Sequence, residues 1–380
     1  MNSANCGLKK RVALLGATGS IGKSSVDIIS QDKNNFDVVL LAAKSNADKL
    51  SELSKLFPNA KTILTCEKDG EKKLLDAVAE LKPDITINGI SGASGLKPSL
   101  AAINAGSDLA LANKETIVMA GPLVLKLAKE KNVKIIPVDS EHSAVFHLIK
   151  FFTKQNELKE NTVKEIILTA SGGPFKNFSL NEMEKVTFKD ALKHPTWNMG
   201  PKITIDSASM ANKGLEIIEA CFLFKMPPDK IKVVIHPQSI VHSMIRLCSG
   251  VIYAQLSKPD MRHPVHDALY YPFSFPSTLE TLDFDSLSLE FSKPDTERFP
   301  MLRLAYDAAQ KEQLYPCAYN AANEIAAAAF MENKISFPDI PKITEKVLQQ
   351  DFKGDIFNLE EILNADTIAR QIADYSVNKL

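Results

Sequence analysis

Residues 11–22 read RVALLGATGSIG, a short apolar run that passes directly into Gly16, Gly19 and Gly22. The next residues, SSVDIIS (24–30), have the pattern of a helix. Strand, glycine turn and helix in this order predict a dinucleotide-binding turn, because glycine lets the backbone approach a pyrophosphate whose charge the helix N-terminus stabilises. The spacing is GxxGxxG, and the alternative is a tight turn that binds no ligand.

Further strand-like runs alternate with helical stretches at FDVVLLAA (36–43), TILT (62–65), DITING (84–89) and DLALA (108–112). Such alternation predicts a parallel, doubly wound sheet. In an open sheet of this type the carboxyl ends of the strands face the ligand. We therefore expect the cofactor-binding residues in the turns after the strands: Thr18, Gly19, Ser20, Ile21, Lys44, Ser45, Asn46, Asn113, Lys114 and Glu115.

The turn after the second strand bears on the choice of cofactor. A site that prefers NAD usually presents an acidic residue to the ribose 2′-hydroxyl at this place. Lys44, Ser45 and Asn46 offer a cation and two hydrogen-bonding side chains, which suit a 2′-phosphate and favour NADPH. The alternative is that Lys44 is a solvated loop lysine.

Composition excludes several classes of protein. A chain of 380 residues predicts two or three domains, and its net charge of −1 argues against a nucleic-acid partner. The five cysteines are scattered, as expected for thiols in a reducing compartment. No signal peptide is recognised, and no apolar run approaches the ~18–20 residues that span a bilayer. We expect a soluble cytoplasmic protein without a membrane partner.

Two carboxylates mark a candidate metal site. In VDSEH (138–142), Asp139 and Glu141 lie two residues apart and would point to one face of an extended strand. Hard oxygen ligands suit Mg²⁺ or Mn²⁺, and a carboxylate from the later stretch that holds Glu216 and Glu219 could complete the site. The alternative is a helix N-terminus that Asp139 or Ser140 caps.

Residues 194–219, HPTWNMGPKITIDSASMANKGLEIIE, combine an imidazole, hydroxyls, an ammonium and carboxylates. The part around Trp197 is bracketed by prolines and predicts a lid loop, with a loop anchored to its own domain as the alternative. A helix is expected from Asp206-Ser207 onward, with Ser207 near its N-terminus holding a phosphate. Glu216 and Glu219 share a helix face, which alternatively is only the solvated side.

Ser171-Gly172-Gly173 follows the apolar run EIILTA and offers backbone N–H groups and a hydroxyl to a phosphate, with a plain turn as the alternative. Strands are expected in 233–247 and 251–257, where they could extend a sheet used for dimerisation. Helical patterns from about residue 301 predict a small bundle of four helices.

Six motifs occur in order: GATGSIG, LANKE, VDSEH, ASGGPF, HPTWNMG and DSASMANKGLE. With them the chain closely resembles the 1-deoxy-D-xylulose 5-phosphate reductoisomerase family over nearly its whole length. The resemblance implies NADPH-dependent conversion of 1-deoxy-D-xylulose 5-phosphate to 2-C-methyl-D-erythritol 4-phosphate in isoprenoid precursor synthesis. It also implies a homodimer that needs Mg²⁺ or Mn²⁺.

The resemblance assigns roles by motif. It implies metal ligation by Asp139, Glu141 and Glu216, and a cofactor contact at Gly200 beside the lid. It implies substrate contacts at Lys114, Ser140, Glu141, Ser171, His194, Ser207, Asn212, Lys213 and Glu216. Trp197 and Met199 match the family's lid. The candidates for proton transfer are Lys114, Glu141 and His142, among which the sequence does not choose.

These arguments predict an α/β protein with a Rossmann-like dinucleotide-binding domain, a central α+β catalytic domain and a C-terminal four-helix bundle. The expected boundaries are 1–138 for the NADPH-binding domain, 139–275 for the catalytic and dimerisation domain with its lid loop 194–202, 276–300 for a linker and 301–380 for the bundle.

Two rival functions remain open at this point. One is another NADP-dependent oxidoreductase, such as a semialdehyde dehydrogenase, which needs a nucleophilic cysteine. The other is a noncatalytic NADP(H)-sensing protein, which needs neither three carboxylates nor a phosphate site. Metal-dependent activity would separate the reductoisomerase from both.

Overall fold

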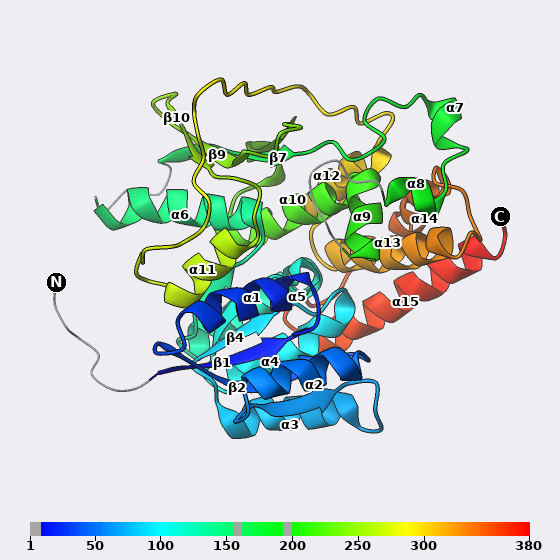
Figure 1. Cartoon of the computed structure of the whole chain (residues 1–380). Helices are drawn as coiled ribbons and strands as arrows, with labels where there is room; N and C mark the ends of the chain where they lie inside the picture. The colour runs from blue at the N-terminus through cyan, green and yellow to red at the C-terminus, as the bar shows by residue number, and fades with distance from the viewer. Residues whose placement is uncertain (1–8, 156–161, 193–199) are drawn as a thin grey trace. The chain divides into compact units, whose positions relative to one another are not determined.

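The computed structural model describes residues 9–155, 162–192 and 200–380. The chain divides into two compact units (Figure 1). The first comprises residues 1–116, 124–139 and 260–279, and the second comprises 117–123, 140–259 and 280–380. None of the helices in the described ranges combines the length and apolar character that crossing a bilayer requires.

The first unit is built on a six-stranded parallel sheet in the order β3-β2-β1-β4-β5-β6. Its strand order reverses between β1 and β4, the place where doubly wound sheets bind ligands. The predicted Rossmann-like fold is therefore confirmed. The strands are β1 (Lys10–Leu15), β2 (Phe36–Ala43), β3 (Lys61–Leu64), β4 (Ile85–Asn88), β5 (Asp108–Leu111) and β6 (Ile135–Pro137).

These strands are continuous apolar runs because helices cover both faces of a parallel sheet. In β4 all four residues are buried, and in β2 only Asp37 is partly exposed. Figure 1 shows α1 and α2 beside β1 and β2. The helices are α1 (Ser20–Gln31), α2 (Ala47–Leu56), α3 (Gly70–Leu81), the 3₁₀ turn η1 (Ala93–Gly95), α4 (Leu96–Asn104) and α5 (Lys114–Glu130).

A late segment of the chain completes the first unit. Helix α11 (Arg262–Tyr270) packs against α1. Tyr270 donates a hydrogen bond of 2.5 Å to Asp32, and its ring packs edge-on against Phe36. Residues 260–275 were predicted to belong to the catalytic domain, whereas residues 260–279 lie in the same compact unit as the nucleotide-binding sheet. The boundary of the functional domain stays a prediction.

The second unit contains a four-stranded sheet in the order β10-β9-β7-β8. β7 (Val163–Ala170) pairs in parallel with β8 (Ile231–Ile235) and antiparallel with β9 (Val241–Leu247), which pairs antiparallel with β10 (Ile252–Leu256). Helix α6 (Ser140–Gln155) packs on β9 and β10. The predicted strands in 233–247 and 251–257 are thus present.

The helix expected from residue 206 onward is in fact two helices. After α7 (Leu180–Met183) and α8 (Phe188–Ala191), α9 (Pro201–Ala208) ends before α10 (Ala211–Phe224) begins. Met210 adopts the left-handed conformation, with a φ of +63°, and this breaks the helical path. The prediction of one helix beginning at Asp206-Ser207 was therefore wrong, since these residues lie in the last turn of α9.

The C-terminal part confirms the predicted four helices. They are α12 (Pro300–Lys311), α13 (Tyr315–Met331), α14 (Asp339–Leu348) and α15 (Leu359–Val377), and α13 packs against each of the other three. Its buried face is rich in alanine, which allows close helix approach, and it carries the fully buried Tyr319, Asn320 and Asn323. Earlier in the chain, the 3₁₀ turn η2 (Pro228–Lys230) lies between α10 and β8.

Candidate active site

The turn after β1 brings the glycine motif to the carboxyl edge of the parallel sheet. Gly16 has a φ of +80°, and a Cβ at this position would lie 2.6 Å from the carbonyl oxygen of Gly89. Only glycine fits this close approach. The predicted cofactor residues 18–21 follow at once and lead into α1. They lie where a pyrophosphate meets a helix N-terminus in this type of fold.

The turn after β2 presents Lys44, Ser45 and Asn46, all exposed. Asn46 caps α2, since its side-chain oxygen accepts a hydrogen bond of 3.1 Å from the Lys49 backbone. The Lys49 ammonium in turn donates to the Thr18 carbonyl at 3.2 Å. Sequence reasoning missed Lys49, although its place in the first turn of the helix after the second strand is a usable signal.

The three polar residues that follow β5, Asn113, Lys114 and Glu115, are buried, and Asn113 is hydrogen-bonded to Glu115. Asn113 caps α5 by accepting from the Thr116 backbone at 3.1 Å, and it donates to the Gly92 carbonyl and to Glu115, both at 2.9 Å. A Cβ on Gly95 would lie 2.3 Å from the side-chain oxygen of Asn113. Asn113 thus ties the loop after β4 to the start of α5, which is a structural role beside the predicted cofactor contact.

Lys114 lies at the same edge of the sheet and pairs with Asp139 at 2.6 Å. Both side chains are largely buried, with exposed fractions of 6 % and 12 %. Asp139 follows β6, and α6 begins at Ser140. The argument that an extended strand aligns Asp139 with Glu141 was therefore wrong, because Glu141 belongs to the first turn of a helix.

Five side chains converge in the second unit. The Lys213 ammonium donates to Glu141 at 2.6 Å and to Glu216. The Asn212 amide donates to the other oxygen of Glu216 at 2.6 Å. Ser140 donates to Glu141 at 2.5 Å. Two carboxylates from α6 and α10 thus share one cation, which shows that both reach a common point.

His142 and Glu219 lie beside this cluster and are almost completely buried. The His142 Nε2 atom is 3.0 Å from the Glu216 carbonyl oxygen, and Nδ1 is 3.4 Å from a Glu219 carboxylate oxygen. A carbonyl oxygen only accepts, so Nε2 carries a proton. Because Glu216 and Glu219 are buried, the alternative that they form the solvated side of a helix is wrong.

Three of the residues predicted to contact the substrate flank the break between α9 and α10: Ser207 lies in the last turn of α9, and Asn212 and Lys213 lie in the first turn of α10. Gly173, with a φ of +67°, packs so closely on Ser207 that a Cβ would lie 2.7 Å from its carbonyl oxygen. This contact brings the Ser171 turn beside Ser207. The expected help from a helix dipole at Ser207 is wrong, because the C-terminal end of a helix disfavours an anion. The N-terminal turn of α10, with Asn212, provides the favourable end instead.

Some predicted residues lie outside the described ranges: His194, Trp197 and Met199. Gly200 is described and exposed, and it precedes α9 as its N-cap. Its carbonyl accepts hydrogen bonds from the backbone and the hydroxyl of Thr204, at 3.1 and 2.9 Å.

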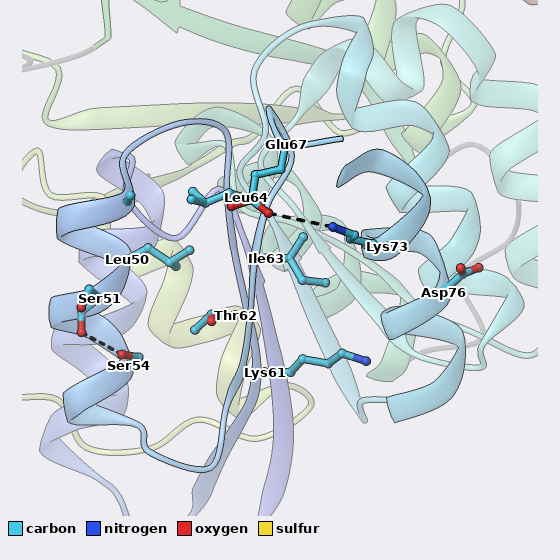
Figure 2. A pocket seen from close by; sticks show the side chains of 11 residues that line it. Leu50, Ser51, Ser54, Lys61, Thr62, Ile63, Leu64, Glu67, Lys73 and Asp76 are labelled. Atoms are coloured by element: carbon cyan, nitrogen blue, oxygen red, sulfur yellow. Dashed lines mark hydrogen bonds and ion pairs between the residues drawn. The ribbon is translucent and has the colours of Figure 1, made fainter. Parts of the chain in front are cut away.

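A separate hollow of about 590 Å³ lies along the edge strand β3 (Figure 2). Leu50 and Ser51 of α2 form one wall and Lys73 and Asp76 of α3 the other. Its charged groups alternate in sign, and it contains none of the predicted catalytic or metal-binding residues. We therefore do not assign the active site to this hollow.

Two cysteines of the second unit do not suit nucleophilic catalysis. Burial raises the pKa of Cys221 to about 12, and burial also raises the pKa of Cys317. A catalytic thiolate requires the opposite shift. These two residues give no support to the rival oxidoreductase that works through a cysteine.

Family models match most of the chain. The model described as 1-deoxy-D-xylulose 5-phosphate reductoisomerase matches residues 12–78 and 58–121, and that of its C-terminal domain matches 135–224. A second C-terminal model, DXP reductoisomerase C-terminal domain, matches residues 256–372.

Curated relatives extend over both units. The chain is 46 % identical over 373 residues to the 1-deoxy-D-xylulose 5-phosphate reductoisomerase of Treponema denticola, covering 96 % of each chain. It is 45 % identical to that of Pelodictyon phaeoclathratiforme, covering 96 % of this chain and 98 % of the relative.

Solved structures agree with this likeness. The enzyme of Zymomonas mobilis in complex with NADPH superposes with a TM-score of 0.89 at 39 % identity, covering 98 % of this chain and all of that one. A DOX-P reductoisomerase in complex with NADPH, fosmidomycin and magnesium has a TM-score of 0.88 at 37 % identity, with 98 % of each chain covered.

Proposed function

The chain belongs to the 1-deoxy-D-xylulose 5-phosphate reductoisomerase family, and we propose how its residues carry that family's reaction. It converts 1-deoxy-D-xylulose 5-phosphate to 2-C-methyl-D-erythritol 4-phosphate, by rearrangement of the carbon skeleton and reduction of the resulting aldehyde with NADPH. The observation that carries the assignment of the site is the convergence of Glu141 and Glu216 on one cation, Lys213.

The metal ligands of this proposal are Asp139, Glu141 and Glu216. Their chemistry fits a divalent cation, since carboxylate oxygens are the ligands that Mg²⁺ and Mn²⁺ prefer. The ion pairs of Lys213 with both Glu141 and Glu216 support this assignment, because the two carboxylates share one positive charge. When bound, the cation would act as a Lewis acid on the carbonyl and hydroxyl oxygens of the sugar.

The substrate phosphate is assigned to the corner between α9 and α10. Ser171 and Ser207 lie on segments in close contact, and Asn212 and Lys213 open α10. His194 completes this set by its motif. A phosphate held away from the reacting carbons supplies binding energy that orients them.

Proton transfer is assigned to Lys114 and Glu141 rather than to His142. Lys114 is an ammonium held at the carboxyl edge of the sheet by Asp139. Glu141 is the more accessible of the two Lys213-bound carboxylates, with 19 % of its side chain exposed. His142 is fully buried with both ring nitrogens facing oxygens of α10, so we assign it the positioning of that helix.

NADPH is assigned to the glycine turn and to the loops after β2 and β5. Lys44 is exposed beside the turn, and Lys49 reaches the Thr18 carbonyl within it. Two ammonium groups near the ribose end of the site favour a 2′-phosphate over a hydroxyl. Gly200 remains in this set because of its motif.

We also propose a cytoplasmic homodimer formed at the edge strand β10. In the described part of the chain β10 is an edge strand, and Ile252 and Tyr253 within it and Val251 just before it expose between 40 % and 50 % of their area. An exposed apolar edge strand favours pairing with a second chain. Light scattering after size exclusion tests the dimer, and Ile252→Lys should yield monomers while Phe284→Lys, at an exposed site elsewhere, should not.

The activity is tested by the loss of NADPH absorbance with 1-deoxy-D-xylulose 5-phosphate. We expect oxidation that a chelator abolishes and Mn²⁺ or Mg²⁺ restores. Glu216→Gln should lose about 100-fold or more, because removal of a ligand costs more than the ~10–100-fold typical of outer-shell partners. Glu184→Gln, at an exposed glutamate of the same unit, is the matched control. No oxidation with any metal would reject the assignment.

A further inference from the structure

Asp206, in the last turn of α9, is a charged residue in a buried place. Only 2 % of it is exposed. The Lys202 ammonium, one turn earlier, donates to one carboxylate oxygen at 2.7 Å. The Asn323 amide donates to the other at 2.8 Å. Asn323 comes from α13 of the C-terminal bundle and is fully buried.

The hydrogen bond to Asp206 holds the side-chain amide of Asn323 in place. A buried carboxylate is costly unless hydrogen bonds compensate it, and here two donors from two helices do so. The side-chain oxygen of Asn323 has no hydrogen-bond partner within the described part of the chain. The bond from its nitrogen to Asp206 is therefore a polar contact between α13 and α9.

The conformation of the corner between α9 and α10 depends on the position of Asp206. The Asp206 carbonyl accepts a hydrogen bond of 3.3 Å from the Ser209 hydroxyl, which in turn accepts from the Ala211 backbone at 3.3 Å. These bonds span the left-handed Met210 and connect the end of α9 to the first residue of α10. Ser207, next to Asp206, lies in the same corner.

Helix α13 also supports α10 directly. Tyr319 donates to the Met301 carbonyl at 3.1 Å, and a Cβ on Gly214 of α10 would lie 2.4 Å from its hydroxyl oxygen. Burial raises the pKa of Tyr319 well above its ordinary value, and the negative charge of Asp206 adds to this shift. One face of α13 therefore contacts both helices of the phosphate corner.

We propose that Asn323 is a positioning residue for the substrate phosphate. By fixing the Asp206 carboxylate, it fixes the corner that presents Ser207 and the first turn of α10. The C-terminal bundle, which carries none of the site residues predicted from the motifs, thus takes part in substrate binding. This inference rests on the proposed function, because it deepens the phosphate site assigned there.

The test combines single substitutions with a reciprocal exchange. Asn323→Ala and Asp206→Asn should each raise the KM for 1-deoxy-D-xylulose 5-phosphate about 10-fold or more, as expected for loss of a hydrogen bond to a charged group. The KM for NADPH should stay unchanged and kcat should fall less. In the double variant Asp206→Asn/Asn323→Asp the amide and the carboxylate change places, Lys202 keeps an acceptor, and the KM should recover.

Asn320→Ala is the matched control. Asn320 is equally buried on α13, but its amide bonds Glu324 of the same helix at 3.2 Å. This variant should lose thermal stability without a change in the KM for substrate. An equal rise in KM for Asn320→Ala, or an exchange that restores stability without restoring KM, would overturn the proposal.

A second readout separates this inference from the proposed function. Inorganic phosphate should raise the melting temperature of the wild type, and Asn323→Ala should weaken its apparent affinity about 10-fold. An inactive wild type rejects the function alone, while an unchanged phosphate affinity in the variant rejects the inference alone. Should Asn323→Ala not fold, Asn323→Ser takes its place.

Discussion

At the scale of single residues, the structure adds partners that the sequence did not reveal. Lys213 was expected to contact a phosphate, and it lies between Glu141 and Glu216. An ammonium among buried carboxylates compensates charge that would otherwise oppose folding. The residue type and its motif are visible in the sequence, whereas the pairing across 72 residues depends on how α6 packs on α10.

Lys49 illustrates a residue that pattern reading overlooked. Lys49→Gln should raise the KM for NADPH about 5-fold and leave the KM for NADH unchanged, because a charge contact near the surface is worth ~1 kcal/mol. Initial rates with both cofactors measure this ratio. Lys55→Gln, at an exposed lysine of the same helix, is the control. An equal loss with both cofactors would mean that Lys49 only supports the turn.

His263 gives the first unit a pH-dependent stability. Burial is the largest influence and lowers the pKa of its imidazole below 6.5, with Arg262 and His266 adding to the shift and Asp260 and Asp267 opposing it. Within the described residues its Nε2 atom has no hydrogen-bond partner. The unfolded chain therefore binds a proton at a higher pH than the folded chain, so stability is complete above about pH 6.5 and falls as the pH falls through the folded pKa.

His263→Gln should remove this part of the dependence. We expect the melting temperature of the wild type to fall more than that of the variant between about pH 7.5 and 5.5. Comparing the two proteins cancels the contribution of every other titrating group. Parallel melting curves over this range would contradict the role given to His263.

At the scale of elements, local patterns predicted most of the fold. The strand–glycine–helix order at 11–30 and the four helices after residue 300 both follow from the spacing of apolar side chains, which can be read directly from the sequence. The break at Met210 does not, because methionine carries no preference for the left-handed conformation that it adopts there. The helix that contains Glu141 was predicted only as the alternative, since two carboxylates two residues apart fit a strand and a capped helix equally.

Gly214 tests how closely α10 must approach the bundle. Gly214→Ala places a methyl group against the Tyr319 hydroxyl and against Ala305, whose Cβ would be 2.8 Å away. Overpacking of this kind costs about 1–3 kcal/mol. Chemical unfolding measures the loss, and activity should fall with it because α10 carries Asn212, Lys213 and Glu216. Adding Tyr319→Phe removes the hydroxyl oxygen, which is the nearest atom, and should recover part of the lost stability. If the free-energy losses of the two substitutions were purely additive, that result would contradict the clash.

At the scale of the whole molecule, the chain does not complete one unit before starting the next. It leaves the first unit for residues 117–123, leaves it again after Asp139 and returns for residues 260–279. Reading in order along the sequence suggested consecutive domains because no local pattern marks such a return. The contacts responsible join residues far apart, such as Lys10, whose ammonium donates to the Leu269 carbonyl at 2.7 Å.

The returning segment should be required for a stable nucleotide-binding unit. Residues 1–139 alone should melt at least several degrees below the same fragment with 260–279 attached through a flexible linker, since ~1 kcal/mol shifts the midpoint by about 2–8 °C. The reason is that Tyr270 covers Phe36 and bonds Asp32. Calorimetry and NADPH fluorescence titration measure both fragments, and Tyr270→Ala in the attached segment should cancel most of the gain. Equal melting and equal NADPH binding without the segment would show that α11 only rests on a unit that is already complete.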